Sequence, residues 1–380
     1  MTHDKKQSPL LRLLAQRYTP PFHHDLPSTV AGMLEKESRR HKFLENFKLL
    51  RRWLWLKLNL PSHLLRDQLP PPPARLLWLH YSSVSIGDSI MELAGRALLG
   101  DYEVNLLTNK QYAELYRGDR FIKRVFTNES DVSAAEYDFV LLDIFNTRSV
   151  QLKRRICPDL PFACMQGFFW GANYNRMLFS CYRIHHLLGY PHGEKELSRF
   201  LSPRLFVEDD PSPLPPKRKQ NRCALLLGGV DAKRTYRHWP DVIRSLRDRW
   251  PSDREFPEFA LIGSQNGRSC VEPVMATLDH CEAASYVGAL TLRQTARAIA
   301  ACDFFMGTDG GLMHCAVALD VPGVAIFGKF LPQLYLPPQS DMQAIYDPAN
   351  VNNVPASIVA EAILKHPWMS GRGFSKSTKC

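Results

Sequence analysis

Long apolar runs are absent from this sequence of 380 residues. No uninterrupted apolar stretch reaches the ~20 residues that a membrane-spanning helix needs. The segment from Leu10 to Ala15 is too short for the core of a signal peptide, and Arg12 interrupts it. We therefore expect a cytoplasmic protein.

Patterns typical of metal sites and disulfide frameworks are also missing. The nine cysteines form no CxxC pair, and the thirteen histidines contain no HExxH motif. Cys157, Cys223 and Cys302 lie in apolar runs, where a free cysteine packs as a small core residue. These features indicate a reducing compartment, and we expect no metal site and no bound cofactor.

Acidic charge is scarce relative to basic charge, which leaves a formal net charge of +10. An excess of this size favours anionic partners: nucleic acid, an acidic membrane surface or a phosphorylated substrate. Charge alone does not choose among these three. No recognisable nucleic-acid-binding module accompanies the basic residues, so we do not expect a nucleic-acid partner.

Residues 1–73 differ in character from the rest and are expected to form an N-terminal helical arm. Its end is marked by the proline run 70–73, a stiff spacer. The segment Lys36–Lys57 carries eight Lys or Arg residues against two glutamates. Apolar residues recur within it at helical spacing: Phe43, Phe47, Leu50, Leu54 and Leu58.

Two interpretations of this basic helix remain open. A basic amphipathic helix with tryptophans can lie on an anionic membrane, so residues 36–60 are a candidate for peripheral membrane contact. Alternatively, the apolar stripe packs on the main body and the charges are solvated, as in ordinary surface helices. The two roles are compatible.

Beyond the spacer, short apolar strands alternate with helices in two halves, which predicts two parallel sheets covered by helices. The proline-rich, charged stretch 208–221 is typical of a linker. We expect domains at 74–207 and 222–380, whose last helix can pack back on the first domain. The main predicted strands are Leu76–His80, Glu103–Leu107, Tyr137–Leu142, Ala224–Leu227, Phe259–Ile262, Phe304–Met306 and Val324–Phe327. The main predicted helices are Ile90–Leu99, Asn173–Leu188, one from Trp239, one near Val271, Leu292–Ala301, Leu312–Leu319 and Ser357–Lys365.

A glycine turn at 307–311 joins the strand Phe304–Met306 to the helix Leu312–Leu319. A helix that starts on such a turn presents free N–H groups and a positive dipole end, which suits a phosphate. A tight turn within an α/β sheet is the plainer alternative. His314, in the first turn of the helix, lies near any bound donor or is a hydrogen-bonded core histidine.

A basic loop follows the first strand of the second half. Gly229 is followed by Lys233, Arg234 and Arg237, and then by a helix that starts near Trp239. Arginine can hold a phosphate with two parallel hydrogen bonds, whereas lysine acts as a point charge. A solvated loop that caps the next helix is the alternative.

The first half has a serine-rich turn after its first strand, with Ser85, Gly87 and Asp88 at a helix start. A carboxylate on such a loop can take a proton from a hydroxyl that attacks an anomeric carbon. Aspartate at a helix start is also a favoured N-cap. Glu92, one turn later, is the nearest rival carboxylate.

Three motifs in this order resemble those of the ADP-heptose:lipopolysaccharide heptosyltransferases (glycosyltransferase family 9), over roughly Leu76 to Pro338. They are Gly87-Asp88, a basic residue before Trp239-Pro240, and Asp309-Gly-Gly-Leu-Met-His314 followed by Ala316–Leu319, Val321-Pro322 and Phe327-Gly328. The chain departs from the family at three places. Gly310 stands where Ser or Thr is usual, Arg237 where Lys is more common, and no Thr-Pro pair follows Asp88.

The resemblance implies a GT-B fold: two Rossmann-like domains facing across a cleft. It also implies an inverting, metal-independent transfer of heptose from ADP-heptose to a lipopolysaccharide inner-core acceptor of the Kdo-lipid A type. Asp88 would be the base, with Ser85 and Gly87 on the acceptor side. The residues expected to bind the donor are Gly229, Lys233, Arg237, Asp309, Gly310, Gly311, Leu312 and His314.

Two other functions fit the same architecture. Gly310 motivates a GT-B-like binding or assembly protein that has lost catalysis, and a nucleotide-sugar epimerase is the third hypothesis. A heptosyltransferase with a basic arm would be cytoplasmic, with peripheral contact at the cytoplasmic face of the inner membrane.

Overall fold

The computed structural model describes residues 9–15, 18, 42–83, 85–168, 175–190, 203–208, 221–229, 231–279 and 282–370. The described chain forms two compact units. The first comprises residues 1–84 and 91–203, and the second comprises residues 85–90 and 204–380. The short segment 85–90 therefore packs with the second unit although its chain neighbours belong to the first. Of the predicted linker, residues 209–220 lie outside the described residues.

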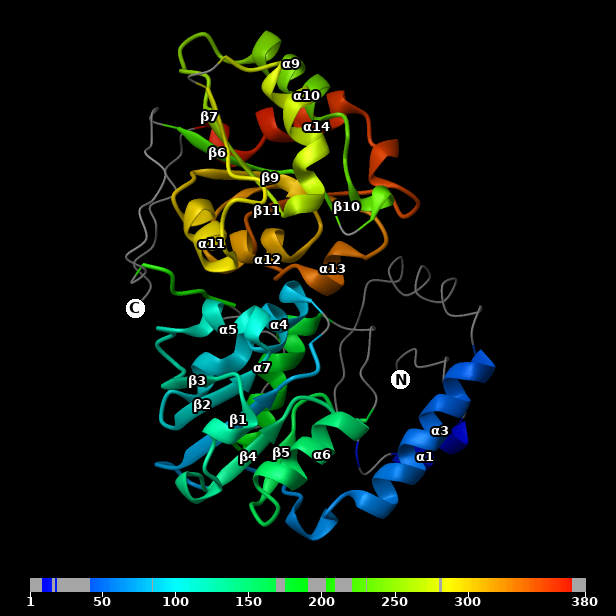
Figure 1. The fold of residues 1–380 in the computed structure, drawn as a ribbon. Coiled ribbons are helices and arrows are strands. Elements are labelled where there is room, and N and C mark those ends of the chain that lie inside the picture. Colours follow the sequence, from blue (N-terminus) through cyan, green and yellow to red (C-terminus); the bar gives the residue numbers. More distant parts are fainter. Residues whose placement is uncertain are drawn as a thin grey trace. The chain divides into compact units, whose positions relative to one another are not determined.

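The first unit contains a five-stranded parallel sheet with the order β3-β2-β1-β4-β5 (Figure 1). The strands are β1 (Arg75–His80), β2 (Glu103–Thr108), β3 (Arg124–Phe126), β4 (Phe139–Leu142) and β5 (Phe162–Cys164). The accompanying helices are α4 (Ile86–Glu92), α5 (Lys110–Tyr116), α6 (Thr147–Ile156) and α7 (Arg176–Leu187). The chain runs outward from β1 to β3, then returns to the other side of β1. The carboxyl ends of β1 and β4 thus form a switch point, where ligands bind in open α/β sheets.

The second unit contains a six-stranded parallel sheet with the order β11-β10-β9-β6-β7-β8. The strands are β6 (Arg222–Leu226), β7 (Glu258–Ile262), β8 (Ala283–Ser285), β9 (Phe304–Thr308), β10 (Gly323–Phe327) and β11 (Met342–Tyr346). The helices are α9 (Trp239–Arg249), α10 (Val271–Met275), α11 (Leu292–Ala300), α12 (Gly311–Ala318), α13 (Pro332–Tyr335) and α14 (Ala356–Leu364). Here the switch point lies between β6 and β9.

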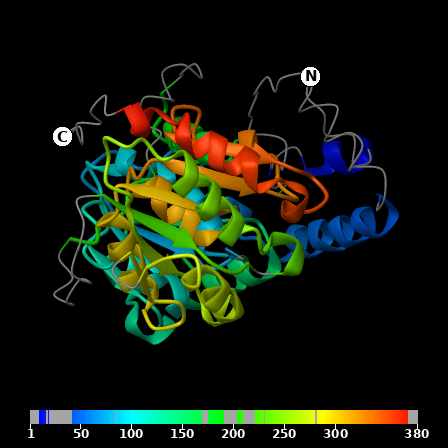
Figure 2. The same ribbon diagram turned by 90° about the horizontal axis from the view of Figure 1, so that it is seen from above.

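Local sequence signals account for the helix starts. Thr291 and Gln294 form a reciprocal capping box at α11, and the Asn175 side chain accepts hydrogen bonds from two N–H groups at the start of α7. Pro240 occupies the first turn of α9, where its missing N–H costs nothing. The last helix, α14, lies beside α9 and packs on the core of its own unit (Figures 1 and 2).

The two parallel sheets with their covering helices confirm the predicted α/β class with two Rossmann-like domains. The predicted helix Ile90–Leu99 is wrong in its bounds. The α-helix α4 already begins at Ile86 and ends at Glu92, and a 3₁₀ segment (Ala94–Leu99) follows. A Cβ added at Gly95 would meet the backbone of Ser180 and Cys181 at 2.9–3.0 Å, so this segment packs backbone to backbone on α7.

The N-terminal arm contains α1 (Pro9–Ala15) and α3 (Lys42–Asn59) within the first unit. Leu56 is fully buried, and Leu49 and Trp53 pack against the same core cluster. The face that the periodicity singled out is instead solvent-exposed, from Phe47 to Leu58. The expectation that this stripe packs on the main body is therefore wrong. Among the residues that the structure describes, no helix combines the length and the apolar character needed to cross a bilayer.

Candidate active site

Three loops meet at the carboxyl ends of neighbouring strands in the second unit. They follow β6, β9 and β10, which are adjacent in the sheet. The loop after β6 carries Arg234, the turn after β9 carries Asp309 and Gly310, and the segment after β10 carries Phe330. Polar groups are thus concentrated at the switch point of a parallel sheet, the usual ligand site of this architecture.

Arg234 is the basic residue that contacts Asp309. Its Nη2 donates to the Asp309 carbonyl oxygen at 2.7 Å and to the Asp309 Oδ2 at 3.0 Å. The Arg234 side chain is 18% exposed and the Asp309 side chain 4%. The Asp231 side chain caps the short 3₁₀ turn Ala232–Arg234 by accepting from the Arg234 N–H. Arg234 is one of three cations in the basic loop, and their spacing in the sequence does not show which of them turns inward.

Asp309 is a buried acid in a mixed electrostatic field. Burial raises its pKa from 3.8 to about 6, and the neighbouring Asp88 charge raises it as well. The Arg234 guanidinium acts in the opposite direction, by charge and by hydrogen bonding. Asp309 is therefore largely ionised at neutral pH, but its pKa of about 6 lies only slightly below that pH.

The start of α12 lies directly after Asp309. Gly310 has an extended backbone (φ 170°, ψ 179°), which any residue adopts, and a Cβ added there would meet only the Thr308 carbonyl oxygen, at 4.0 Å. A serine or threonine would therefore fit. Gly311 differs, because an added Cβ would lie 2.9 Å from the Cβ of Ile86. The free N–H groups at this helix start are suited to an anionic ligand.

The segment 85–90 brings Asp88 to this region of the second unit. Ser85 caps the helix: its Oγ accepts from the Asp88 N–H at 3.2 Å and donates to the Asp88 Oδ2 at 2.8 Å. Asp88 itself sits inside the first turn of α4, so it is not the N-cap. Its carboxylate is half-buried and close enough to Asp309 to influence that residue's pKa.

Gly87 and His314 are in close contact. A Cβ at Gly87 would lie 2.5 Å from the His314 Cδ2, so only glycine allows this approach. His314 is 3% exposed, and its Nε2 lies 3.9 Å from the Asp309 Oδ1. Its ring lies 6.5 Å from that of Tyr335, which in turn contacts Phe330. His314 is thus both buried and part of the polar cluster.

We call Asp88, Arg234, Asp309 and His314 the central cluster. Phe330 and Tyr335 border it: the Arg234 guanidinium lies 5.4 Å from the Phe330 ring centroid. Neither aromatic residue is among the site residues predicted from the sequence. The available signal was their position just after β10, since residues that follow neighbouring parallel strands meet at one edge of the sheet.

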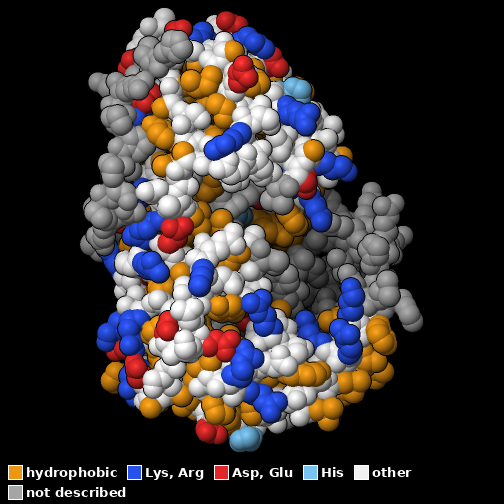
Figure 3. Space-filling view, in the orientation of Figure 1, with side chains coloured by type: hydrophobic (Ala, Val, Ile, Leu, Met, Phe, Trp, Pro, Cys, Tyr) orange, Lys and Arg blue, Asp and Glu red, His pale blue; other side chains and the backbone are white. Residues whose placement is uncertain are grey.

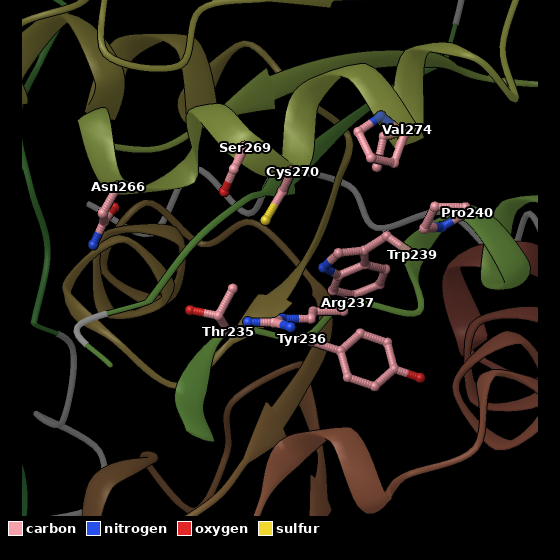
Figure 4. A pocket seen from close by; sticks show the side chains of 10 residues that line it. Thr235, Tyr236, Arg237, Trp239, Pro240, Asn266, Ser269, Cys270 and Val274 are labelled. Carbon is pink, nitrogen blue, oxygen red and sulfur yellow. The ribbon is translucent and has the colours of Figure 1, made fainter. Parts of the chain in front are cut away.

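Lys233 and Arg237 are both exposed and have different surroundings. The Lys233 carbonyl oxygen would lie 3.9 Å from a Cβ added at Gly328, which places its backbone at the end of β10. Arg237 lines a separate pocket of about 460 Å³. Figure 4 shows Asn266, Ser269 and Cys270 across this pocket from the segment that carries Arg237.

Gly229 helps to join the loops after β6 and β7. Its carbonyl oxygen accepts from the Asn266 Nδ2 at 2.6 Å, and a Cβ added at Gly229 would lie 2.4 Å from the Arg234 carbonyl oxygen. Gly228 has a positive φ of 86° and packs on the backbone of Gly267. This glycine packing fixes the loop that presents Arg234 and Arg237.

A second polar cluster lies at the switch point of the first sheet. The Asp143 carboxylate, just after β4, accepts from the Tyr81 and Ser82 N–H groups, just after β1. Ser83 Oγ donates to Glu92 Oε2 at 2.5 Å and lies 2.9 Å from His80 Nε2. Glu92 is the alternative candidate for the base, and its carboxylate is therefore already engaged in a hydrogen bond within the first unit.

Glu92 should make stability depend on pH. Burial raises its pKa from 4.5 to about 7, so the folded state holds the proton more tightly than the unfolded state. Its contribution to stability is fully present below pH 4.5 and is lost as the pH rises towards 7. We expect Glu92→Gln to flatten this dependence and to raise the unfolding free energy at pH 8 by up to roughly 3 kcal/mol. Urea titrations at several pH values would test this, and an unchanged slope would contradict it.

Comparisons with known proteins bear on the class and the fold of this chain. Residues 237–355 match the model of Glycosyltransferase family 9 (heptosyltransferase). The sequence has no match among curated proteins. With the fold, the family match defines the class: the protein is a glycosyltransferase. This match confirms the resemblance to the heptosyltransferases that the motifs carry.

Solved structures share the fold at low sequence identity. A glycosyl transferase family 9 protein from Veillonella parvula DSM 2008 is 13% identical with a TM-score of 0.60; the match covers 78% of this chain and 98% of that one. The E. coli heptosyltransferase WaaC with ADP is 16% identical with a TM-score of 0.57, covering 76% and 98%. The E. coli ADP-heptose lps heptosyltransferase II is 17% identical with a TM-score of 0.52, covering 75% and 96%.

Within the described part of the chain, no group of three His, Cys, Asp or Glu side chains is placed to hold a metal ion. The described cysteines are free thiols, and all but Cys270 are buried.

Proposed function

We propose that this protein transfers heptose, with inversion, from a nucleotide-heptose such as ADP-heptose to a lipopolysaccharide inner-core acceptor. The observation that carries the proposal is the joint position of Asp88, Asp309 and the start of α12. A base for the acceptor hydroxyl thereby lies near a binding site for the anionic donor. The solved heptosyltransferases of the same fold include one with ADP.

Asp88 would act as the general base. In an inverting transfer the acceptor oxygen attacks the anomeric carbon while its proton passes to a carboxylate, and the bond to the diphosphate breaks. The hydrogen bond from the Ser85 Oγ fixes the orientation of the Asp88 carboxylate. We assign Ser85 and Gly87 to the acceptor side, with Gly87 setting the distance to His314.

The donor would be held by the second unit. Negative charge develops on the departing nucleoside diphosphate, and N–H groups of Gly310 to Leu312 can stabilise it where it forms. Lys233 and Arg237 would add positive charge from the loop after β6, with Gly229 keeping that loop in place. Asp309, held by Arg234, would accept hydrogen bonds from sugar hydroxyls, and His314 would flank them.

The acceptor would be lipid-linked, of the Kdo-lipid A type. We therefore place the protein in the cytoplasm with peripheral contact at the inner membrane. The exposed basic arm supports this placement, because it offers cations and apolar side chains on one surface.

Gly310→Ser would test the position of the diphosphate. The site has room for the side chain, so the fold should tolerate it. A hydroxyl that donates to a phosphate oxygen should lower the Kd for ADP by roughly tenfold. Gly310→Ala, which adds the Cβ without the hydroxyl, is the matched control and should bind like the parent. Equal affinities in all three proteins would place the diphosphate elsewhere.

Thermal shift with ADP-, UDP- and GDP-sugars tests the function as a whole, because a ligand of the folded state raises the apparent Tm. We expect the largest rise with ADP-heptose, and then transfer when an acceptor is added. Binding without transfer or hydrolysis would favour a catalytically silent binding protein. Release of an isomerised sugar without acceptor would identify an epimerase.

A further inference from the structure

Helix α3 is apolar on two opposite sides. One side faces the first unit: Leu56 is buried there, and the Trp53 Nε1 donates to the Leu14 carbonyl oxygen of α1 at 2.9 Å. This packing anchors the helix to the core that also contains Phe145 and Phe162. Anchoring therefore requires none of the apolar residues on the other side.

The opposite side carries an apolar ridge whose members recur every three or four residues along the helix. Its members, with their exposed fractions, are Phe47 (61%), Leu50 (36%), Leu54 (49%) and Leu58 (83%). Figure 3 shows hydrophobic side chains gathered over α3 with Lys and Arg side chains beside them. Large exposed apolar side chains that form a continuous row indicate a contact surface, whereas scattered ones do not.

The charge around the ridge has one sign. Lys48, Arg51 and Lys57 are exposed beside it. Between residues 46 and 60 the sequence contains no aspartate and no glutamate. An apolar row bordered only by cations is complementary to a surface that is apolar beneath and anionic above.

We propose that the outer side of α3 docks on the surface of a bilayer that contains anionic lipids, with Phe47, Leu50, Leu54 and Leu58 inserted between the headgroups. A second copy of the chain is disfavoured as the occupant, since a symmetric contact would bring the cations Lys48, Arg51 and Lys57 of one copy against the same cationic set of the other. Docking would bring the enzyme to the lipid acceptor proposed above, and this role of the contact rests on the proposed function. Binding itself does not.

Flotation of the full chain with vesicles tests the proposal. We expect binding to vesicles of phosphatidylglycerol mixed with phosphatidylethanolamine, and much weaker binding to phosphatidylcholine alone. Leu54→Ser combined with Leu58→Ser should reduce the partition coefficient at least about tenfold, because both side chains lose their apolar insertion. Lys48→Gln combined with Arg51→Gln should reduce it by roughly tenfold or more, and the loss should shrink at high salt.

Matched controls distinguish binding through this surface from non-specific binding to vesicles. Ile358→Ser alters a side chain of similar exposure (47%) in the second unit, and Lys110→Gln removes an exposed cation from α5. Both should bind vesicles like the parent. The vesicles contain no glycosyl acceptor and the assay no nucleotide sugar, so its outcome is independent of the transferase activity. Leu54→Ser with Leu58→Ser should likewise leave transfer to a water-soluble acceptor unchanged.

Two outcomes would overturn the proposal. The first is that the parent and the Leu54→Ser, Leu58→Ser variant bind vesicles equally well, or that neither of them binds. The other is a parent protein that sediments as a dimer and a variant that sediments as a monomer, which would assign the ridge to a second copy.

Discussion

Asp88→Asn is expected to lower kcat for sugar transfer by about 10²- to 10⁴-fold, the range that a general base contributes. The amide keeps the shape of the side chain and can still accept from the Ser85 Oγ, so folding should be unchanged. Nucleotide binding should also be nearly unchanged, because the diphosphate contacts assigned above lie on α12 and the loop after β6. Single-turnover transfer and ADP calorimetry measure the two effects separately.

The same substitution has a second, independent readout. Since the Asp88 charge helps to raise the pKa of Asp309, its removal should lower that pKa from about 6. Asp248→Asn, on the exposed side of α9, is the matched control and should change neither quantity. Glu92→Gln should retain transfer. A fully active Asp88→Asn protein, or an inactive Glu92→Gln protein that folds normally, would reassign the base.

Arg234→Met is expected to have the second largest effect. The Asp309 carboxylate is 4% exposed, and it would lose the hydrogen bonds and the charge that favour its ionised form. Breaking a buried ion pair on one side typically costs about 3–5 kcal/mol, and the partial exposure of Arg234 places this case near the lower value. The pKa of Asp309 should rise above about 6, so activity near pH 7 should fall and recover at higher pH.

Comparison with further variants distinguishes stability from function. Arg234→Met combined with Asp309→Asn should regain most of the lost stability, because no uncompensated charge stays buried, but it should not regain transfer. Arg237→Met is the control for loss of an arginine, and it should leave the unfolding free energy nearly unchanged because that side chain is exposed. Urea unfolding and pH–rate profiles supply both measurements. If Arg237→Met were as destabilising as Arg234→Met, the assigned role of the Arg234–Asp309 pair would be wrong.

The sheets were predictable because parallel strands covered on both faces read as short apolar runs. Leu76–His80 and Phe259–Ile262 are examples, and both are strands of the structure. The strands β3, β5, β8 and β11 were missed. The first three of these have only three residues, and a segment such as Ala283–Ser285 is held by its neighbour in the sheet and carries no pattern of its own. The helix start at Gly311 was predictable from its glycine turn.

The site was predictable in part, for physical reasons. Spacing showed that basic residues follow β6 but not that the Asp231 cap turns Arg234 towards Asp309 and leaves Arg237 at a separate pocket. Likewise, helical periodicity identified the row from Phe47 to Leu58 but not its exposure. Because α3 has a second apolar side, only tertiary packing decides which side is buried.

The most direct test of the central claim is the reaction of the full chain with ADP-heptose and a Kdo-lipid A-type acceptor, followed by NMR of the product's anomeric linkage. The account predicts a heptosylated acceptor with inverted configuration, formed by the parent protein and not by Asp88→Asn. A retained configuration, or equal product from both proteins, would contradict it.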